Sequence, residues 1–272
     1  MPRPEYEAWY DALAWYPTPA SGLVPESDLA PAAWIEPRLR ARSFDVGMSA
    51  PQGFEAYARI LFPFAGEDIE TEGMLTNQEH VTWTETARRN GRVAHALMEQ
   101  ETILAPGQEA ICLNELADEQ FDLLLPILAR HTSSAHGWFL LWDGFGDLDQ
   151  DSFGSQPRLT HPMRDFYLLS GAHASYRNLP HDPSYWWPDD RSWCLCTDTD
   201  FYWAYIAGSA ECVSEVLSVP ELDAYATNPG NPARSGMDVI NDPHGTIARY
   251  TLKIMTLTIS GKLVSAESSG QT

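Results

Sequence analysis

Hydrophobic residues recur at helical spacing in several parts of the chain. Near the N-terminus, large apolar side chains fall three or four positions apart and predict one face of a helix: Tyr6, Trp9, Tyr10, Leu13 and Tyr16. Another helix is expected from a threonine cap near position 82 to about Gln100, weakened by Gly91. A third should begin at Asp118, with Pro126 kinking or dividing it, and a fourth should follow a cap at Ser209.

Shorter apolar runs predict β-strands between these helices. Two kinds of side chain alternate along residues 54–64, as expected of a strand whose faces differ. The apolar runs at 137–146 and 164–171 end in glycine, and the alternation is clearest over residues 193–203. β-Branched residues also alternate over 251–259. Because strands and helices do not follow one another in regular β-α-β order, the pattern favours an α+β fold. We expect a single domain with a mainly antiparallel or mixed sheet flanked by helices.

The charge balance narrows the function more than any other compositional fact. The chain has 272 residues, and its 17 basic and 38 acidic residues give a net charge of −21. Such a surface repels phosphate groups, so we expect neither nucleic acid nor an anionic membrane as a partner. Two interpretations stay open: recognition of a basic protein partner, or simple solubility in a salty cytoplasm.

Targeting signals are missing from the sequence pattern. The N-terminal stretch MPRPEYEAWYDALAWYP lacks a basic region followed by an apolar one, and no apolar run is long enough to span a bilayer. The thiols of Cys112, Cys194, Cys196 and Cys212 are therefore expected to be reduced, in a cytoplasmic protein.

The stretch WCLCTDTDFYW, residues 193–203, raises the question of a metal site. In one extended strand, Cys194, Cys196, Asp198 and Asp200 would share a face opposite Leu195. The C-x-C spacing is not that of a zinc pair, and no second cysteine pair matches it. We interpret the segment as a structural core strand, with a functional site as the alternative, and expect no metal and no cofactor.

Other motifs are weaker. The run at Asp147, Asp149 and Asp151 resembles a calcium loop, but its sixth and twelfth positions are Ser152 and Arg158, so an acidic hairpin loop is expected. No nucleophile elbow, phosphate-binding loop or dinucleotide fingerprint is present. The sequence therefore predicts no catalytic residues.

The segment WWPDDRSW offers the best candidate binding residues: Trp186, Trp187, Asp189, Asp190 and Arg191. Tryptophan and arginine are enriched as interface anchors, so a loop with these residues suits a protein interface or ligand cleft. A buried Arg–Asp clamp that positions the strand is the favoured alternative, because interior charges are normally paired.

An enzyme is the alternative function. It would place a cleft around Asp189, Arg191, Asp198 and Asp200, with His173 nearby. Paired carboxylates beside aromatic rings shift each other's pKa values, and this divides the roles of acid and base between them. On this hypothesis Asp198, Asp200 and His173 are the acid/base candidates for a small-molecule substrate.

The order of several segments resembles that in a family of uncharacterised actinobacterial proteins. FEAYARI, ARHTSSAHGWFLLWDGFG, FYLLSG, WWPDDRSWCLCTDTDFYWAYIAGS and NPARSGMDVIND carry the resemblance, which covers about 54–241. The family brings no known activity. It implies a core domain at 54–241 and an extension at 242–272, while the residue pattern before the core predicts an N-terminal helix and wrapping segment at 1–53. The function expected from charge and motifs is a non-enzymatic acidic protein of the immunity or antitoxin kind.

Overall fold

The computed structural model describes residues 14–40, 43–65, 69–71, 74–76, 80–160 and 164–245. The chain forms two compact units: the first takes in 1–63 and 112–231, and the second 64–111 and 232–272. The predicted boundaries at 53/54 and 241/242 stay predictions. The expected alternation at 251–259, and nearly all of the expected N-terminal helix, lie outside the described residues.

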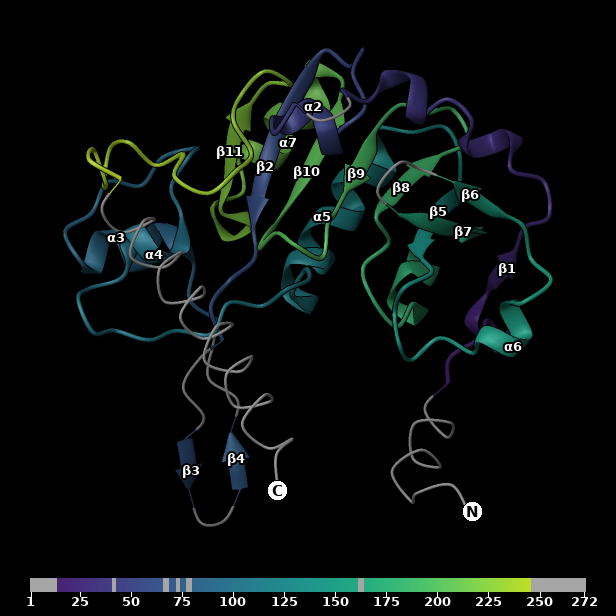
Figure 1. Cartoon of the computed structure of the whole chain (residues 1–272), viewed down its shortest axis with the longest axis horizontal. Coiled ribbons are helices and arrows are strands. Elements are labelled where there is room, and N and C mark those ends of the chain that lie inside the picture. Colours follow the sequence, from purple (N-terminus) through teal and green to yellow (C-terminus); the bar gives the residue numbers. More distant parts are fainter. Residues whose placement is uncertain are drawn as a thin grey trace, which may run out of the picture. The chain divides into compact units, whose positions relative to one another are not determined.

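A nine-stranded sheet runs through the first unit, and every strand pair in it is antiparallel. Figure 1 shows the strands. The order across the sheet is β1 (Leu23–Pro25), β7 (Asp165–Ala172), β5 (His136–Trp142), β8 (Tyr185–Pro188), β9 (Cys194–Cys196), β10 (Trp203–Gly208), β2 (Ala56–Leu61) and β11 (Ala224–Thr227), with β6 (Arg158–Thr160) beside β7. The sheet and its helices confirm the predicted α+β class.

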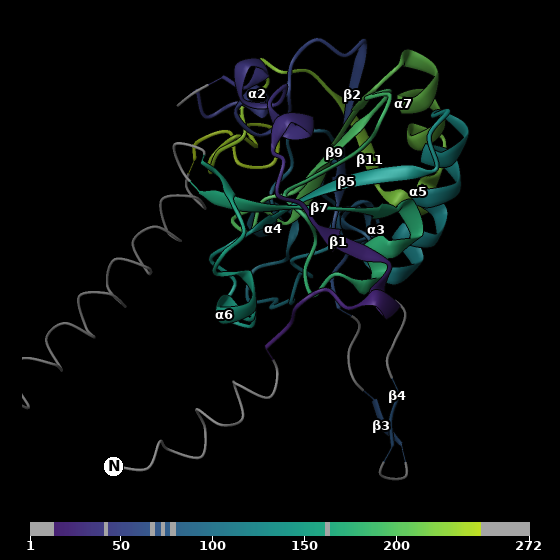
Figure 2. The same ribbon diagram turned by 90° about the vertical axis from the view of Figure 1, so that its right-hand side faces the viewer.

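One face of the sheet is an apolar row covered by helices. Trp186 lies opposite Phe139 on one side and Leu195 on the other, and Leu195 lies opposite Ile206. Directly opposed residues share a face, so these four side chains are neighbours. Helices α5 (Asp118–Arg130) and α7 (Ala210–Leu217) contact each other and lie together on one side of the sheet (Figure 2).

The N-terminal wrapping segment covers the opposite face. It consists of three 3₁₀ turns, η1 (Pro19–Ser21), η2 (Ala30–Ala32) and η3 (Glu36–Arg38), and the short helix α2 (Val46–Ser49). Trp34 from this segment packs edge-on against Trp187, with ring centroids 5.9 Å apart. Because both faces are covered, every residue of β8, β9 and β10 is buried.

The predicted strand at 193–203 is wrong: the chain turns back within it to form the β9–β10 hairpin. The Asp198 carboxylate accepts a hydrogen bond from the Asp200 N–H at 3.0 Å, and the Asp198 carbonyl accepts one from the Phe201 N–H at 2.9 Å. Aspartate favours such turns because its side chain binds the backbone two residues on. Cys196 therefore pairs with Tyr205 of the returning strand.

Helix boundaries follow the local capping chemistry. In the second unit, Thr82 caps α3 (Trp83–Arg89), which ends before Gly91 at a left-handed φ of 65°. The prediction that this helix reaches Gln100 is therefore wrong, and the next helix is the short α4 (Gln100–Ile103). This unit also contains the antiparallel hairpin of β3 (Ile69–Thr71) and β4 (Met74–Thr76).

In the first unit, α5 continues through Pro126 to Arg130, so the proline does not divide it. Ser209 caps α7 as predicted, and its hydroxyl accepts a hydrogen bond from the Cys212 N–H. The remaining elements are α6 (Gln150–Phe153), η4 (His173–Asn178) and η5 (Pro220–Leu222). Among the described residues, no helix has both the length and the apolar character needed to cross a bilayer.

Candidate functional site

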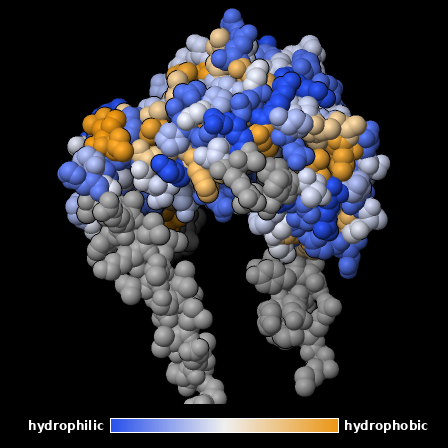
Figure 3. Space-filling model, turned by 45° about the horizontal axis from the view of Figure 1, so that its top comes forward, coloured by the Kyte–Doolittle hydropathy of each residue, from blue (hydrophilic) through white to orange (hydrophobic). Residues whose placement is uncertain are grey.

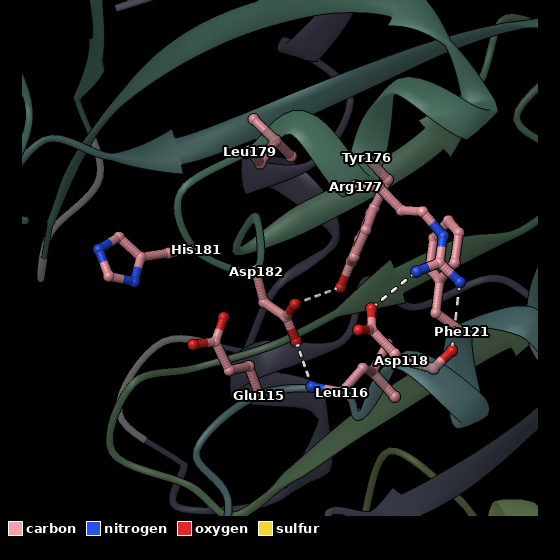
Figure 4. Close-up of a pocket in the computed structure, with 9 residues that line it drawn as sticks. All are labelled: Glu115, Leu116, Asp118, Phe121, Tyr176, Arg177, Leu179, His181 and Asp182. Carbon is pink, nitrogen blue, oxygen red and sulfur yellow. Dashed lines mark hydrogen bonds and ion pairs between the residues drawn. The ribbon is translucent and has the colours of Figure 1, made fainter. Parts of the chain in front are cut away.

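A cavity of about 120 Å³ lies in the first unit, where the start of α5 meets η4 and the chain that follows it (Figure 4). Its lining mixes acidic, aromatic and basic side chains: Glu115, Leu116, Asp118, Phe121, Tyr176, Arg177, Leu179, His181 and Asp182. No enzyme motif marks these residues in the sequence, so their grouping depends on the fold.

Ring stacking and ion pairing position the wall formed by α5 and η4. Phe121 of α5 stacks on Tyr176 of η4 with ring centroids 4.7 Å apart. The Arg177 guanidinium lies 4.6 Å from the centroid of the same Phe121 ring and forms ion pairs with Asp118, at 2.7 Å, and with Asp122. Arg177 is therefore held against α5 by two carboxylates.

Asp182 is the central acidic group of the cavity. Its Oδ1 accepts a hydrogen bond from the Tyr176 hydroxyl at 2.6 Å, and its Oδ2 accepts one from the Leu116 N–H at 2.8 Å. Burial raises the pKa of Asp182 to about 7, against the lowering effect of both hydrogen bonds, and the Glu115 carboxylate raises it further. Burial and the neighbouring Asp182 also raise the pKa of Tyr176 well above its usual value. Asp182 therefore titrates near neutral pH.

His181 does not form a catalytic pair with Asp182, although the two are adjacent in sequence. Its Nε2 lies 2.9 Å from the Asp147 carboxylate, and its ring stacks on Phe145 with centroids 3.9 Å apart. Figure 4 shows the imidazole directed away from the Asp182 carboxylate. The groups left to meet a ligand are the Asp182 and Glu115 carboxylates and the Tyr176 hydroxyl, which suit binding of a cation or hydrogen-bond donor.

The tryptophans proposed from sequence as binding residues are core residues. Trp186 and Trp187 are 0% and 1% exposed. The prediction of an exposed tryptophan loop is wrong because both residues belong to β8, in the interior of a sheet covered on both faces. The Trp186 indole N–H donates to His173 Nδ1 at 3.3 Å, so its polar atom also has a partner.

Asp189 and Asp190 lie in the exposed turn after β8 and bind β5 and the segment leading into it. Asp189 accepts from the Trp138 indole N–H at 2.6 Å, and Asp190 accepts from the Ser133 N–H at 2.8 Å. Burial raises both pKa values, but hydrogen bonds outweigh it and leave them below the usual range. Arg191 lies 5.5 Å from the Trp34 ring centroid. The expected buried Arg–Asp clamp is therefore wrong too, since these aspartates accept from hydroxyl, amide and ring N–H groups at the surface.

The structure does not unite the alternative acid/base residues. Asp198 and Asp200 lie in the β9–β10 turn and share Arg164, at 3.0 and 2.7 Å. Burial raises the pKa of Asp198, and Arg164 opposes this. His173 places its Nε2 3.0 Å from the Ser134 carbonyl, and burial lowers its pKa. Because the turn at 189–191 precedes β9 and that at 198–200 follows it, the two aspartate pairs lie at opposite ends of this strand.

The cysteines of β9 are part of the packed sheet. The Sγ atoms of Cys194 and Cys196 lie 3.6 Å apart, and both residues are buried. Burial and the neighbouring Cys194 raise the pKa of the Cys196 thiol well above its usual value, so it is not a thiolate at neutral pH. The described residues contain no cluster of three or more His, Cys, Asp or Glu side chains that fits a metal ion.

The sequence resembling a calcium loop also has a structural role. The Asp149 carboxylate caps α6 by accepting a hydrogen bond from the Ser152 N–H at 3.1 Å, while Asp147 binds His181. The segment therefore forms a capped helical turn before β6 instead of the expected hairpin loop.

Sequence reasoning missed Tyr176 and Asp182. They lie in YRNLPHD, a polar stretch without recognisable spacing, and Glu115 comes from a distant segment. The one local signal is the aspartate between Pro180 and Pro183, which indicates a constrained turn. Comparisons with protein-family models, curated proteins and solved structures found no match to this chain, so the resemblance to an actinobacterial family stays a prediction.

Proposed function

We propose that this chain is a non-enzymatic, cytoplasmic binding protein of the immunity or antitoxin kind, which recognises a basic protein. The net charge of −21 supports a cationic partner and disfavours nucleic acid. Hydrophilic residues also cover most of the face in Figure 3, with hydrophobic residues in small separate groups. Such a surface favours recognition by charge over a large apolar interface.

The observation that carries this proposal is the acidic helical layer, defined as the carboxylates of α5, α7 and η5. These three elements contact one another. They contain one basic residue, Arg130, against six acidic ones: Asp118, Glu119, Asp122, Glu211, Glu215 and Glu221. Arg130 is itself paired with Glu215. Arg177 of η4 also pairs with Asp118 and Asp122. The six carboxylates still outnumber these two arginines, so the layer is negative on balance.

Negative charge concentrated in this way mainly affects the rate of association with a partner and the choice between partners. A negative surface attracts a positive one over a distance of about 10 Å at moderate salt, and complementary charge accelerates association. The same field excludes acidic competitors, because like charges brought together cost free energy. A basic nuclease or another cationic protein fits this description.

The test is affinity capture from the native host with two charge variants. The layer variant carries Glu119→Gln, Glu211→Gln and Glu221→Gln. The control carries Glu36→Gln, Glu101→Gln and Glu109→Gln, which remove the same charge from exposed positions elsewhere. We expect wild type and control to retain the same basic protein at low salt, and the layer variant to lose about tenfold in affinity.

Two results would contradict the proposal. One is a retained partner that is acidic or a nucleic acid. The other is equal loss of binding in the layer variant and the control, which would show that net charge alone, and no particular surface, governs retention.

A further inference from the structure

We propose that the cavity around Asp182 is a subsite for a cationic nitrogen group, an alkylammonium or guanidinium such as the end of a lysine or arginine side chain. This inference rests on the proposed function, because it names the part of a basic partner that the cavity receives. Asp118 and Phe121 belong to α5 and also line the cavity, so the subsite adjoins the acidic helical layer.

The size of the cavity fits one such group. Its volume of about 120 Å³ approaches that of an engineered protein cavity of about 150 Å³ that holds benzene. Leu179, which is only partly buried, supplies apolar wall for the methylene stem of the ligand. Long cationic side chains bury such stems while placing the charged end in a polar site.

The charges around the cavity favour a cation. Arg177 is engaged by Asp118 and Asp122, so its positive charge is already matched. Figure 4 shows the Glu115 side chain next to Asp182, and Glu115 raises the pKa of that carboxyl by repulsion. A bound cation would attract both carboxylates and so offset the repulsion between them.

Asp182 keeps hydrogen-bonding capacity for a ligand. A carboxylate offers about four acceptor positions, and hydrogen bonds from Tyr176 and Leu116 occupy one on each oxygen. These bonds also fix the orientation of the carboxylate before a ligand arrives. An N–H donor entering the cavity would meet an acceptor already held in position, and the hydrogen bond is strong when Asp182 is ionised.

The probes are n-butylammonium and methylguanidinium ions, titrated into the full chain and followed by two-dimensional amide NMR. We expect saturable shifts at Leu116, Tyr176 and Asp182. Butyrate has a similar apolar chain with a negative charge, and n-butanol has the same chain without charge. Neither should produce saturable shifts at these amides.

Asp182→Asn and Glu115→Gln should each weaken the binding of n-butylammonium by about tenfold. Asp151→Asn, at an exposed position in α6, should not change this affinity.

The pH dependence gives a second readout. The other titratable or charged residues that line the cavity are Glu115, Tyr176, Asp118, Arg177 and His181. Because the pKa of Asp182 is about 7 and a cation favours the ionised form, binding should be about tenfold tighter at about pH 8 than at about pH 6. The Asp182→Asn variant should lose this dependence.

The outcomes separate this inference from the proposed function. The subsite is refuted if the shifts caused by n-butylammonium do not saturate, or if this ion binds Asp182→Asn as tightly as wild type. Capture of a basic partner by the acidic helical layer would then be unaffected. If n-butylammonium binds as expected but the host yields no basic partner, the subsite is supported and the proposed function fails.

Discussion

Replacing Trp186 by alanine is expected to lower the free energy of unfolding by about 3–5 kcal/mol, the range for removing a large buried aromatic side chain. Trp186 is fully buried and contacts Tyr176 and Trp193, with ring centroids 4.8 and 5.0 Å away. Its loss would leave a void between the sheet and α5 and would remove the indole N–H that binds His173. Equilibrium unfolding in urea, followed by near-ultraviolet circular dichroism, measures the change.

The matched control is Tyr202→Ala, at an aromatic residue that is 41% exposed in the β9–β10 turn. This substitution should lower the free energy of unfolding by no more than about 0.5 kcal/mol, as is usual at surface positions. A loss below about 1 kcal/mol for Trp186→Ala would contradict its central place in the core.

Asp182→Asn should become progressively more stable than wild type as pH rises towards neutrality. Burial raises the pKa of Asp182 in the folded state to about 7, from a usual value of 3.8, so the folded chain holds this proton more tightly than the unfolded chain. The stability it contributes is complete below the lower value and is lost as pH rises through about 7. Asparagine preserves the shape of the side chain, can accept from Leu116 and can donate to Tyr176.

The expected relative gain for Asp182→Asn is roughly 2 kcal/mol between about pH 5.5 and about pH 8. Urea unfolding of both proteins at these two pH values measures it, and taking the difference cancels the titration of other groups. Asp151→Asn, at an exposed position, serves as the control and should show no such trend. A difference between wild type and Asp182→Asn that does not change with pH would refute a raised pKa at this carboxyl.

The hydrophobic pattern predicted three long strands of the sheet and missed the β9–β10 hairpin. The runs at 54–64, 137–146 and 164–171 overlap β2, β5 and β7, because buried strands keep a strong local apolar signal. Polar and apolar residues continue to alternate from 193 to 203, so periodicity alone does not reveal that the strand ends at Cys196, before the turn that contains Asp198. The turn depends on a side-chain hydrogen bond that competes with extension.

The candidate site was less predictable because it depends on contacts between distant segments. Trp186 and Trp187 next to Pro188 and two aspartates are typical of a loop, yet coverage of both faces of the sheet buries the tryptophans. Conversely, nothing near Asp182 in sequence indicates a raised pKa. That shift arises because burial in the folded chain disfavours the ionised carboxylate, and the Glu115 carboxylate adds a smaller increase.

The most direct test of the central claim is the salt dependence of the rate at which the captured basic partner associates with this protein. Stopped-flow measurements would compare wild type, the layer variant and the charge-matched control. We predict that the wild-type rate falls by tenfold or more from low to high salt, roughly the scale of electrostatic steering. The control should follow wild type, and the layer variant should be slower at low salt and converge with both at high salt. Identical rates for wild type and the layer variant at every salt concentration would contradict recognition through the acidic helical layer.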